Sequence, residues 1–495
     1  MPGSCDSDPR NRIVDRSLAR LGLLSDVSPM FVDAKERLAT RHKAEELGQE
    51  LARLRIEQRS AMMGFLYVDG HVRAYHGERD IPKAHVARIR IAMPATTDYW
   101  VGDAAGDPLF VVTAEANAGL AKMLPPVLEQ VQSLIPGRRV TVVFDRGGWK
   151  MELFLQIIRD FKFDILTYRK GRTPEIDPER FSLHQTSIDG RRVEHVLHDQ
   201  RVTFLDGKLK LRQVTRLNDN GHQTQIITSR FDLPPAEVAF RMFERWRQEN
   251  YFRYSREEFA LDALSDYQVE AGDPTRTVPN PERREVAKQI KTVRKEIKSL
   301  EQSLGASLLV AKDKNQPAVA ALSDAYAQVE AKLAAARDHL KSLLCKRRET
   351  PLRVEICDIS EGAVIKLATE RKHLTNIIKM LAYQAESSLL ALLEPHFCRS
   401  EDEGRTLIHE ILSARADLRV DGSILAVTLH PLTSPHRPIA VDKICDTLTG
   451  TQSLFPGSSL QRRFDIHSPP KIGLAFPGPR PTATPLDTAN RTSRH

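Results

Sequence analysis

The chain has 495 residues, enough for roughly two or three domains, and its 73 Lys and Arg residues outnumber its 65 Asp and Glu residues. This mildly basic balance permits nucleic-acid binding but does not identify it. The 5 cysteines are scattered without a CxxC pair, which indicates a reducing cytoplasm and argues against a disulfide framework or a zinc site. The sequence contains neither an apolar run of the about 20 residues that a membrane span needs nor a GxxxxGK[ST] motif for a nucleotide cofactor.

The N-terminal region, residues 1–61, is expected to be helical, because residues 32–61 have the pattern of one charged helix. We find no convincing pair of recognition helices in it. This region is therefore expected to be a truncated DNA-binding part, unless recognition of the DNA ends lies elsewhere.

A first carboxylate of interest, Asp69, follows the apolar segment 64–68, which predicts a strand that ends at this residue. Asp69 and Gly70 together are also a strong hairpin signal, since residues 71–75 alternate like a returning strand. Asp69 thus has two interpretations, a functional group at a strand end or an ordinary turn residue.

A second carboxylate, Asp145, follows the continuous β-branched run 139–144, which predicts a central strand covered on both faces. Chemistry in α/β enzymes lies beyond such strand ends, so two strands that each end in an aspartate suggest a site for a hard metal ion. The alternative is that Asp145 is only a turn residue or a helix N-cap. The elements predicted around it are a strand, a helix, a second helix and a second strand, at 108–112, 116–134, 150–161 and 163–168.

A third carboxylate, Glu249, lies in a predicted helix over 234–264. It is three residues from Trp246 and from Phe252, so we expect it to share a face with these aromatic side chains and to be partly shielded from water. Such a carboxylate is costly unless a cation neutralises it. The alternative is a solvated glutamate paired with Arg245 or Arg253.

Four segments together resemble the bacterial insertion-sequence transposases of the DDE class. They are Val68-Asp69-Gly70-His71-Val72-Arg73-Ala74-Tyr75-His76-Gly77, Thr97-Asp98-Tyr99-Trp100-Val101, Phe144-Asp145-Arg146-Gly147-Gly148-Trp149 and Arg245-Trp246-Arg247-Gln248-Glu249-Asn250-Tyr251-Phe252. The resemblance implies an α/β fold with an RNase H-like catalytic core and a metal-binding triad formed by Asp69, Asp145 and Glu249. It also implies Mg²⁺ or Mn²⁺ as the cofactor, with transposon ends and target DNA as partners.

Basic side chains accompany the three carboxylates, as phosphate binding requires. The residues that we expect to contact DNA are Arg146, Arg245, Arg247 and Arg253. A homodimer on DNA is the expected assembly.

The expected domain organisation continues beyond the N-terminal region with a catalytic domain at 62–265, which carries a β-rich insertion at about 185–232. A polar linker over 270–281 precedes two helices with heptad-like apolar spacing, which predict a coiled-coil hairpin at 282–350. The same apolar seam would serve packing within the chain or dimerisation. A mixed α/β C-terminal region at 351–467, mainly helical in its first part, and a disordered tail at 468–495 complete the chain.

The first helix of this hairpin has a basic outer face, which is usually only a solvated surface and would otherwise be a contact for the DNA backbone. The function expected from the whole pattern is cleavage at transposon ends and joining of the 3′-hydroxyl to target DNA. Two alternatives remain open at this point. One is a nuclease of the same fold that cuts without joining, and the other is a catalytically inactive DNA-binding remnant of a mobile element.

Overall fold

The computed structural model describes residues 42–467, apart from 80, 87–88, 115–117, 172, 265–266, 312–317, 361, 398, 431 and 433–436. The side chains of 304–311, 318–326, 401–402 and 438 are also not described. Most of the expected N-terminal region, the break between the two long helices and the expected disordered tail lie outside the described residues.

The centre of the molecule is one large mixed sheet of 10 strands in the order β2-β3-β1-β5-β6-β10-β9-β8-β7, with β4 paired to β3. The strands are β1 (Phe65–Ala74), β2 (Lys83–Val86), β3 (Ile91–Gly102), β4 (Pro108–Ala114), β5 (Thr141–Phe144), β6 (Asp164–Tyr168), β7 (Ser182–Ile188), β8 (Arg191–Phe204), β9 (Leu209–Leu217) and β10 (Gln223–Thr228). Strands β1, β5 and β6 are parallel neighbours, whereas the pairs to either side of them are antiparallel.

The prediction of a hairpin at Asp69-Gly70 is wrong, because β1 runs without a turn through residue 74. Its antiparallel partner is β3, and residues 71–75 continue the first strand instead of returning along it. Gly70 lies opposite Tyr99, and a Cβ at Gly70 would approach Tyr99 Cε1 to 2.9 Å. The glycine thus makes room for an aromatic ring across the strand pair, which is a packing role that resembles a turn signal in the sequence.

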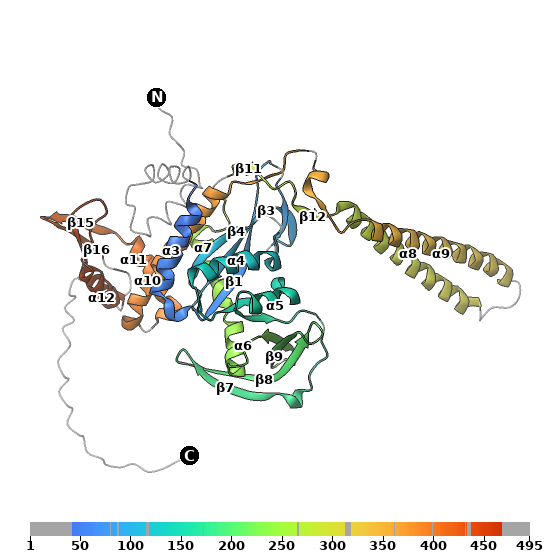
Figure 1. Cartoon of the computed structure of the whole chain (residues 1–495), viewed down its shortest axis with the longest axis horizontal. Coiled ribbons are helices and arrows are strands. Elements are labelled where there is room, and N and C mark those ends of the chain that lie inside the picture. Colours follow the sequence, from blue (N-terminus) through green and yellow to red (C-terminus); the bar gives the residue numbers. More distant parts are fainter. Residues whose placement is uncertain are drawn as a thin grey trace, which may run out of the picture.

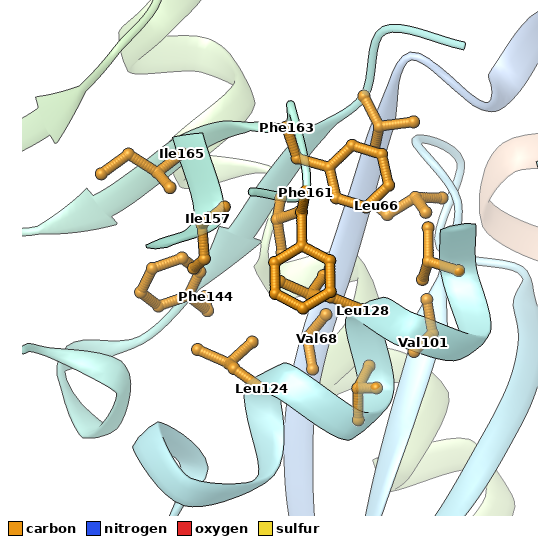
Figure 2. Packing of buried hydrophobic residues seen from close by; sticks show 14 of the residues in the cluster. Leu66, Val68, Val101, Leu124, Leu128, Phe144, Ile157, Phe161, Phe163 and Ile165 are labelled. Carbon is orange, nitrogen blue, oxygen red and sulfur yellow. The ribbon is translucent and has the colours of Figure 1, made fainter. Parts of the chain in front are cut away.

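The prediction that β5 is covered on both faces is confirmed. On one face Phe144 packs with Leu124 of α4 (Leu120–Leu134) and Ile157 of α5 (Met151–Arg159), as Figure 2 shows. On the other face Val143 packs with Met242 of α6 (Pro235–Phe243). Helices on both faces explain why the strand consists of apolar and β-branched residues throughout.

The helix predicted over 234–264 is two helices, α6 and α7 (Trp246–Phe259). Between them the backbone tightens, since Arg247 N bonds to Glu244 O and Gln248 N bonds to Arg245 O, both with the i to i−3 spacing of a 3₁₀ turn. This change of direction aims α7 at the strand pair β1–β3, where its Tyr251 packs against Trp100.

A helical layer lies beside β4, formed by α3 (Ala44–Gln58) and α10 (Thr369–Leu393). Helix α3 is the described part of the helix expected over 32–61. Its Arg55 makes a buried two-point contact with Asp107, which precedes β4, through Nε–Oδ1 and Nη2–Oδ2 distances of 3.0 and 2.9 Å. The contact fastens the N-terminal helix to the sheet.

Two long helices, α8 (Pro281–Ala311) and α9 (Ala318–Glu349), project from the rest of the molecule (Figure 1). They run antiparallel, since Glu282 near the start of α8 pairs with Lys346 near the end of α9. The apolar seam of α8 packs on α9 within the chain, through contacts such as Val286 and Ile290 with Leu343.

The segment expected to be a linker over 270–281 is partly paired. Strand β11 (Val269–Ala271) pairs with β14 (Ile365–Leu367), and β12 (Thr277–Pro279) pairs with β13 (Arg353–Glu355). Both ladders join the chain before the long helices to the chain after them, so the helical pair is an excursion from the core.

The C-terminal part holds α11 (Ser400–Ser413), α12 (Arg437–Gly450) and a sheet of β15 (Ala416–Asp421), β16 (Ile424–Leu429) and β17 (Gln461–Ile466). Short 3₁₀ turns are found at Ser60–Met62, Arg146–Gly148, Pro178–Arg180, Ile356–Asp358 and Glu394–His396. Among the helices that the structure describes, none combines the length and the apolar character needed to cross a membrane.

Candidate functional site

Asp69 and Asp145 lie at adjacent positions of the parallel strands β1 and β5. The last paired residues of this ladder are Val68 and Phe144, and each aspartate is the next residue of its strand segment. Asp145 comes directly after β5, whereas Asp69 is an interior residue of β1, which continues past the end of β5. The two carboxylates are therefore brought together at one sheet edge, as the sequence predicted, although Asp69 does not end its strand.

Asp145 also has the capping role that the alternative interpretation gave it. Its Oδ1 accepts a hydrogen bond of 2.7 Å from Gly147 N at the start of the 3₁₀ turn, and its carbonyl accepts one of 3.3 Å from Thr167 Oγ1 on β6. The cap uses one carboxylate oxygen and fixes the orientation of the group. Structural and functional interpretations of Asp145 are thus compatible.

The electrostatic surroundings of Asp69 set it apart from a solvated carboxylate. Burial raises the pKa of Asp69 above its usual value, Arg245 opposes this shift and the neighbouring Asp145 adds to it. Its Oδ1 accepts from Gly70 N at 2.8 Å, and its Oδ2 accepts from Arg245 Nη2 at 2.9 Å.

Both aspartates affect the pKa of Tyr99 on β3. Its hydroxyl donates to Ala118 O at 2.6 Å, and its pKa is raised by burial first and then by Asp145 and Asp69. One phenol that responds to both negative charges indicates that the carboxylates share a common region over the sheet.

Glu249 lies in the first turn of α7 and is exposed, so the expectation that aromatic residues shield it is wrong. Phe252 is buried, but the indole of Trp246 is 47% exposed. The reason is the orientation of α7, which turns Gln248, Tyr251 and Phe252 toward the protein and leaves Glu249 on the outer side of the helix.

Glu249 is nevertheless close to the same edge of the sheet. Tyr168 is the last residue of β6, the strand next to β5. Its pKa is raised mainly by burial, and of the nearby charges Arg245 lowers this pKa whereas Glu249 raises it. Glu249 N also bonds to Arg245 O, so the residue that contacts Asp69 is one helical turn from Glu249.

The three carboxylates do not form a tight cluster. In the part of the chain that the structure describes, the group of three His, Cys, Asp or Glu side chains whose ligand atoms all lie within 4.8 Å of one another is Asp417, His430 and His467, in the C-terminal sheet. The structure therefore brings Asp69 and Asp145 together and places the helix of Glu249 beside them, joined through Arg245.

Gln248 positions this helix, although its sequence context did not mark it as a functional residue. Its Nε2 donates to Tyr67 O at 3.2 Å and to Trp100 O at 3.0 Å, which ties α7 to the strands β1 and β3. The side chain is 3% exposed. In the sequence, the one feature that could have indicated this role is that Gln248 precedes Glu249 and shares a helix face with Tyr251 and Phe252.

The four arginines expected to contact DNA differ in their surroundings. Arg146 and Arg253 are exposed, and the Arg146 guanidinium lies 5.7 Å from the centre of the Tyr168 ring. Arg247 forms an ion pair with Glu244, and Arg245 is occupied by Asp69. Arg146 and Arg253 are therefore the two with the greatest access to a ligand.

Comparisons with known proteins bear on the whole chain. The cryo-electron microscopy structure of a piggyBac transposase synaptic complex with hairpin DNA is similar at 10% identity with a TM-score of 0.28, over 39% of this chain and 41% of that one. The match thus spans less than half of that protein, and a likeness this remote carries no argument. No curated protein matches the chain. A family model described as "Transposase protein" matches residues 30–468, which is most of the sequence, so the chain belongs to this transposase family.

Proposed function

We propose that the chain is a DNA transposase of the DDE class that uses Asp69, Asp145 and Glu249 to bind Mg²⁺ or Mn²⁺. The observation that carries the proposal is the adjacent placement of Asp69 and Asp145 on parallel strands, with α7 fastened beside them by Arg245. Family membership supports the same function.

The donor set suits a hard divalent ion. Asp69 and Asp145 offer carboxylate oxygens, the ligands that Mg²⁺ and Mn²⁺ prefer, and the raised pKa of Asp69 reflects burial together with a like charge nearby that a cation would relieve. Arg245 supplies positive charge at Asp69 Oδ2, so the guanidinium would compete with a metal ion bound by Asp69. Glu249 would be the third metal ligand, once its side chain turns from solvent toward Asp69 and Asp145.

The chemistry that bound metal supplies is activation of a water or a 3′-hydroxyl and stabilisation of the departing 3′-oxygen. The protein's own contribution is positioning. The cap on Gly147 N orients Asp145, and Gln248 holds α7 against β1 and β3 so that Glu249 stays at the strand edge. Arg146 directly follows Asp145, and Arg253 lies four residues after Glu249 on α7; both are exposed cations suited to contact the DNA backbone.

The order of elements supports an RNase H-like core for this proposal. Antiparallel strands β1, β3 and β4 come first, with the short β2 added between β1 and β3 in the chain and paired to β3; α4, parallel β5, α5 and parallel β6 follow. Strands β7 to β10 then precede α7, which agrees with a β-rich insertion before the catalytic glutamate. A homodimer on DNA is part of the proposal and is tested by sedimentation of the protein with and without DNA.

The function is tested with a plasmid in which this reading frame, inactivated by a stop codon, and its flanking genomic DNA interrupt a reporter gene. Expression of the protein in trans should restore the reporter by excision, and Asp145→Ala should abolish excision while retaining DNA binding. Glu152→Ala, which removes an exposed carboxylate of α5, is the matched control and should remain active. Excision by Asp145→Ala at the wild-type rate would remove the assignment.

The two alternatives give different outcomes. A nuclease without joining activity would yield cut ends but no insertions of the excised DNA into a target plasmid. For an inactive remnant, Glu249→Gln would not reduce Mn²⁺ binding relative to the wild type. The reporter would also stay interrupted with the wild type and with every variant.

A further inference from the structure

Three metal-ligating side chains converge in the C-terminal sheet, far from the strand edge of Asp69 and Asp145 in the sequence. His430 Nε2 lies 3.2 Å from Asp417 Oδ1, and His467 Nε2 lies 2.9 Å from Asp417 Oδ2. The two imidazole centres are 5.3 Å apart at an interplanar angle of 83°. All three ligand atoms fall within 4.8 Å of one another.

The register of the sheet produces this convergence. Antiparallel pairing of β15 with β16 ends at Ala416 and Leu429, and parallel pairing of β16 with β17 ends at Leu429 and Ile466. Each ladder extends by one residue, because His430 N bonds to Arg415 O and His467 N bonds to Leu429 O, both at 2.8 Å. The two histidines therefore stand side by side at the ends of adjacent strands.

The three side chains also lie on the same face of the C-terminal sheet. Leu429, Phe464 and Ile466 pack toward Val441 of α12, and successive side chains of a strand point to opposite faces. His430 and His467 accordingly project from the face away from α12. Asp417 of β15 meets them there, so one ligand comes from each of three strands or strand ends.

We propose that Asp417, His430 and His467 bind a divalent transition-metal ion of the zinc type. Imidazole nitrogen and carboxylate oxygen are ligands of Zn²⁺, whose bond lengths of about 2.0 to 2.2 Å in tetrahedral geometry place neighbouring ligand atoms roughly 3.3 Å apart. Each imidazole nitrogen lies near this separation from a different oxygen of Asp417, His430 Nε2 at 3.2 Å from Oδ1 and His467 Nε2 at 2.9 Å from Oδ2, and one ligand atom from each residue falls within 4.8 Å of the others. Three protein ligands leave a fourth position for water.

The ligand set differs from the carboxylates of the proposed catalytic site, because nitrogen donors favour zinc over magnesium. The cysteine pattern had argued against a zinc site, and no cysteine takes part in this one. The spacing of 13 residues between Asp417 and His430, and of 37 between His430 and His467, matches no compact motif and becomes a site only through the strand register.

The ion would add a contact to a strand whose residues are all exposed and which pairs with one neighbour, β16. All residues of β15 are exposed, with Leu418 at 63% and Val420 at 60%, and this strand lies at the edge of its sheet next to β16 (Figure 1). A metal shared by Asp417 and His467 would connect β15 directly to β17, across the intervening strand. The role of the site would thus be to stabilise the C-terminal sheet.

The test uses the full-length protein, stripped of metal with a chelator and kept in excess Mg²⁺ so that oxygen-ligand sites are filled. Titration with Co²⁺ should give one equivalent with the visible absorption of four-coordinate cobalt, and Zn²⁺ should displace it. His430→Gln and His467→Gln should each weaken binding at least by the roughly 10- to 100-fold that loss of an outer-shell partner costs. Zn²⁺ should raise the Tm of the wild type but not of these variants.

The control is His184→Gln, which removes a histidine of β7 that contacts Ser182 and should leave the cobalt spectrum unchanged. Wild-type protein that takes up no Co²⁺, or variants that bind it as the wild type does, would show that the cluster is only a hydrogen-bonded carboxylate. The measurement needs no DNA, so its result is independent of whether the chain cleaves DNA.

Discussion

Arg245 Nη2 lies 2.9 Å from Asp69 Oδ2, so the residue that precedes the first residue of α7 neutralises the carboxylate on β1. The two side chains are 12% and 21% exposed. Burial raises the pKa of Asp69, Arg245 lowers it and Asp145 raises it further. The arginine is therefore the protein's own counter-charge for the carboxylate pair.

Replacement of Arg245 by Gln should lower the free energy of unfolding at neutral pH by about 1–3 kcal/mol, because a partly buried charge loses its charged hydrogen-bond partner. The folded-state pKa of Asp69 then rises further above its unfolded value, so protonation favours the folded variant. The difference from wild type should shrink as pH falls through that raised pKa. Urea unfolding of both proteins at neutral and acidic pH measures it.

A pH-independent difference would contradict this account of Asp69. In the same experiment Mn²⁺ should recover more stability in Arg245→Gln than in the wild type, because the guanidinium no longer competes for Asp69. Equal effects of Mn²⁺ on the two proteins would argue against metal binding by Asp69.

Gln248→Leu should impair activity without touching a carboxylate. The change removes two hydrogen bonds and leaves the Tyr67 and Trp100 carbonyls without this donor, at a cost of about 1–3 kcal/mol. Since α7 then loses its fixed position, excision should fall more strongly than DNA binding. Urea unfolding and the reporter assay measure the two effects, with Glu257→Gln on the exposed side of α7 as the control.

Local sequence patterns correctly predicted strands that consist of an uninterrupted run of apolar or β-branched residues. The run before Asp145 predicted a strand buried on both faces, because every residue of β5 is apolar or β-branched. The Asp69-Gly70 pair predicted a false turn, because a glycine needed for the Tyr99 ring is indistinguishable in sequence from a glycine needed for a hairpin. A continuous apolar run thus predicts both conformation and burial, whereas a single glycine does not reveal whether it forms a turn or makes room for a ring.

Tertiary contacts decided the features that the sequence could not predict. The break between α6 and α7 depends on packing of α7 against β3 and α10, and the exposure of Glu249 follows from that orientation. The contact of Gln248 with two strand carbonyls joins residues 181 and 148 positions apart. No local pattern records such a contact, so the triad's existence could be proposed from sequence but its geometry could not.

Lys379 should make stability depend on pH in a defined direction. It is buried, donates to Ala260 O at 2.9 Å just after α7, and burial lowers its pKa to about 7. Between about pH 7 and its unfolded pKa near 10.4 the unfolded chain binds the extra proton, so the free energy of unfolding rises with pH by at most about 1.4 kcal/mol per unit.

Lys379→Met should lack this gain. The stability difference between wild type and variant should therefore shift in favour of the wild type as pH rises from 7 to about 10. Urea unfolding under reducing conditions at several pH values checks the sign. A difference that stays constant across this range would show that the ammonium titrates normally in the folded protein.

The buried pair of Arg55 and Asp107 should show strong coupling. The side chains are 8% and 4% exposed, and Arg55 also donates to Ser388 Oγ of α10 at 3.0 Å. Arg55→Leu alone leaves a buried carboxylate without its partner and should cost about 3–5 kcal/mol, whereas the double variant with Asp107→Asn should lose less than the sum of the single changes. Additive losses in urea unfolding would contradict the direct pairing.

The basic outer face of α8 offers a test of DNA binding outside the carboxylate site. The exposed cations between Glu282 and Lys298 are Arg284, Lys288, Lys291, Arg294, Lys295 and Lys298, whereas Arg283 is half-buried and donates to Arg347 O and Thr350 O. Replacement of the exposed Lys291, Lys295 and Lys298 by Gln should reduce the slope of log K against log salt concentration for duplex DNA by about 0.9 for each phosphate that the variant no longer neutralises.

The matched control is the triple replacement of Lys332, Lys341 and Arg348 by Gln, which removes the same charge from exposed positions of α9. If α8 binds the DNA backbone, the α8 variant alone should show the smaller slope, because counterion release depends on where the cations lie and not on net charge. An equal change in both variants, measured by titration of labelled duplex at several salt concentrations, would instead show a general effect of charge and leave the α8 face as a solvated surface.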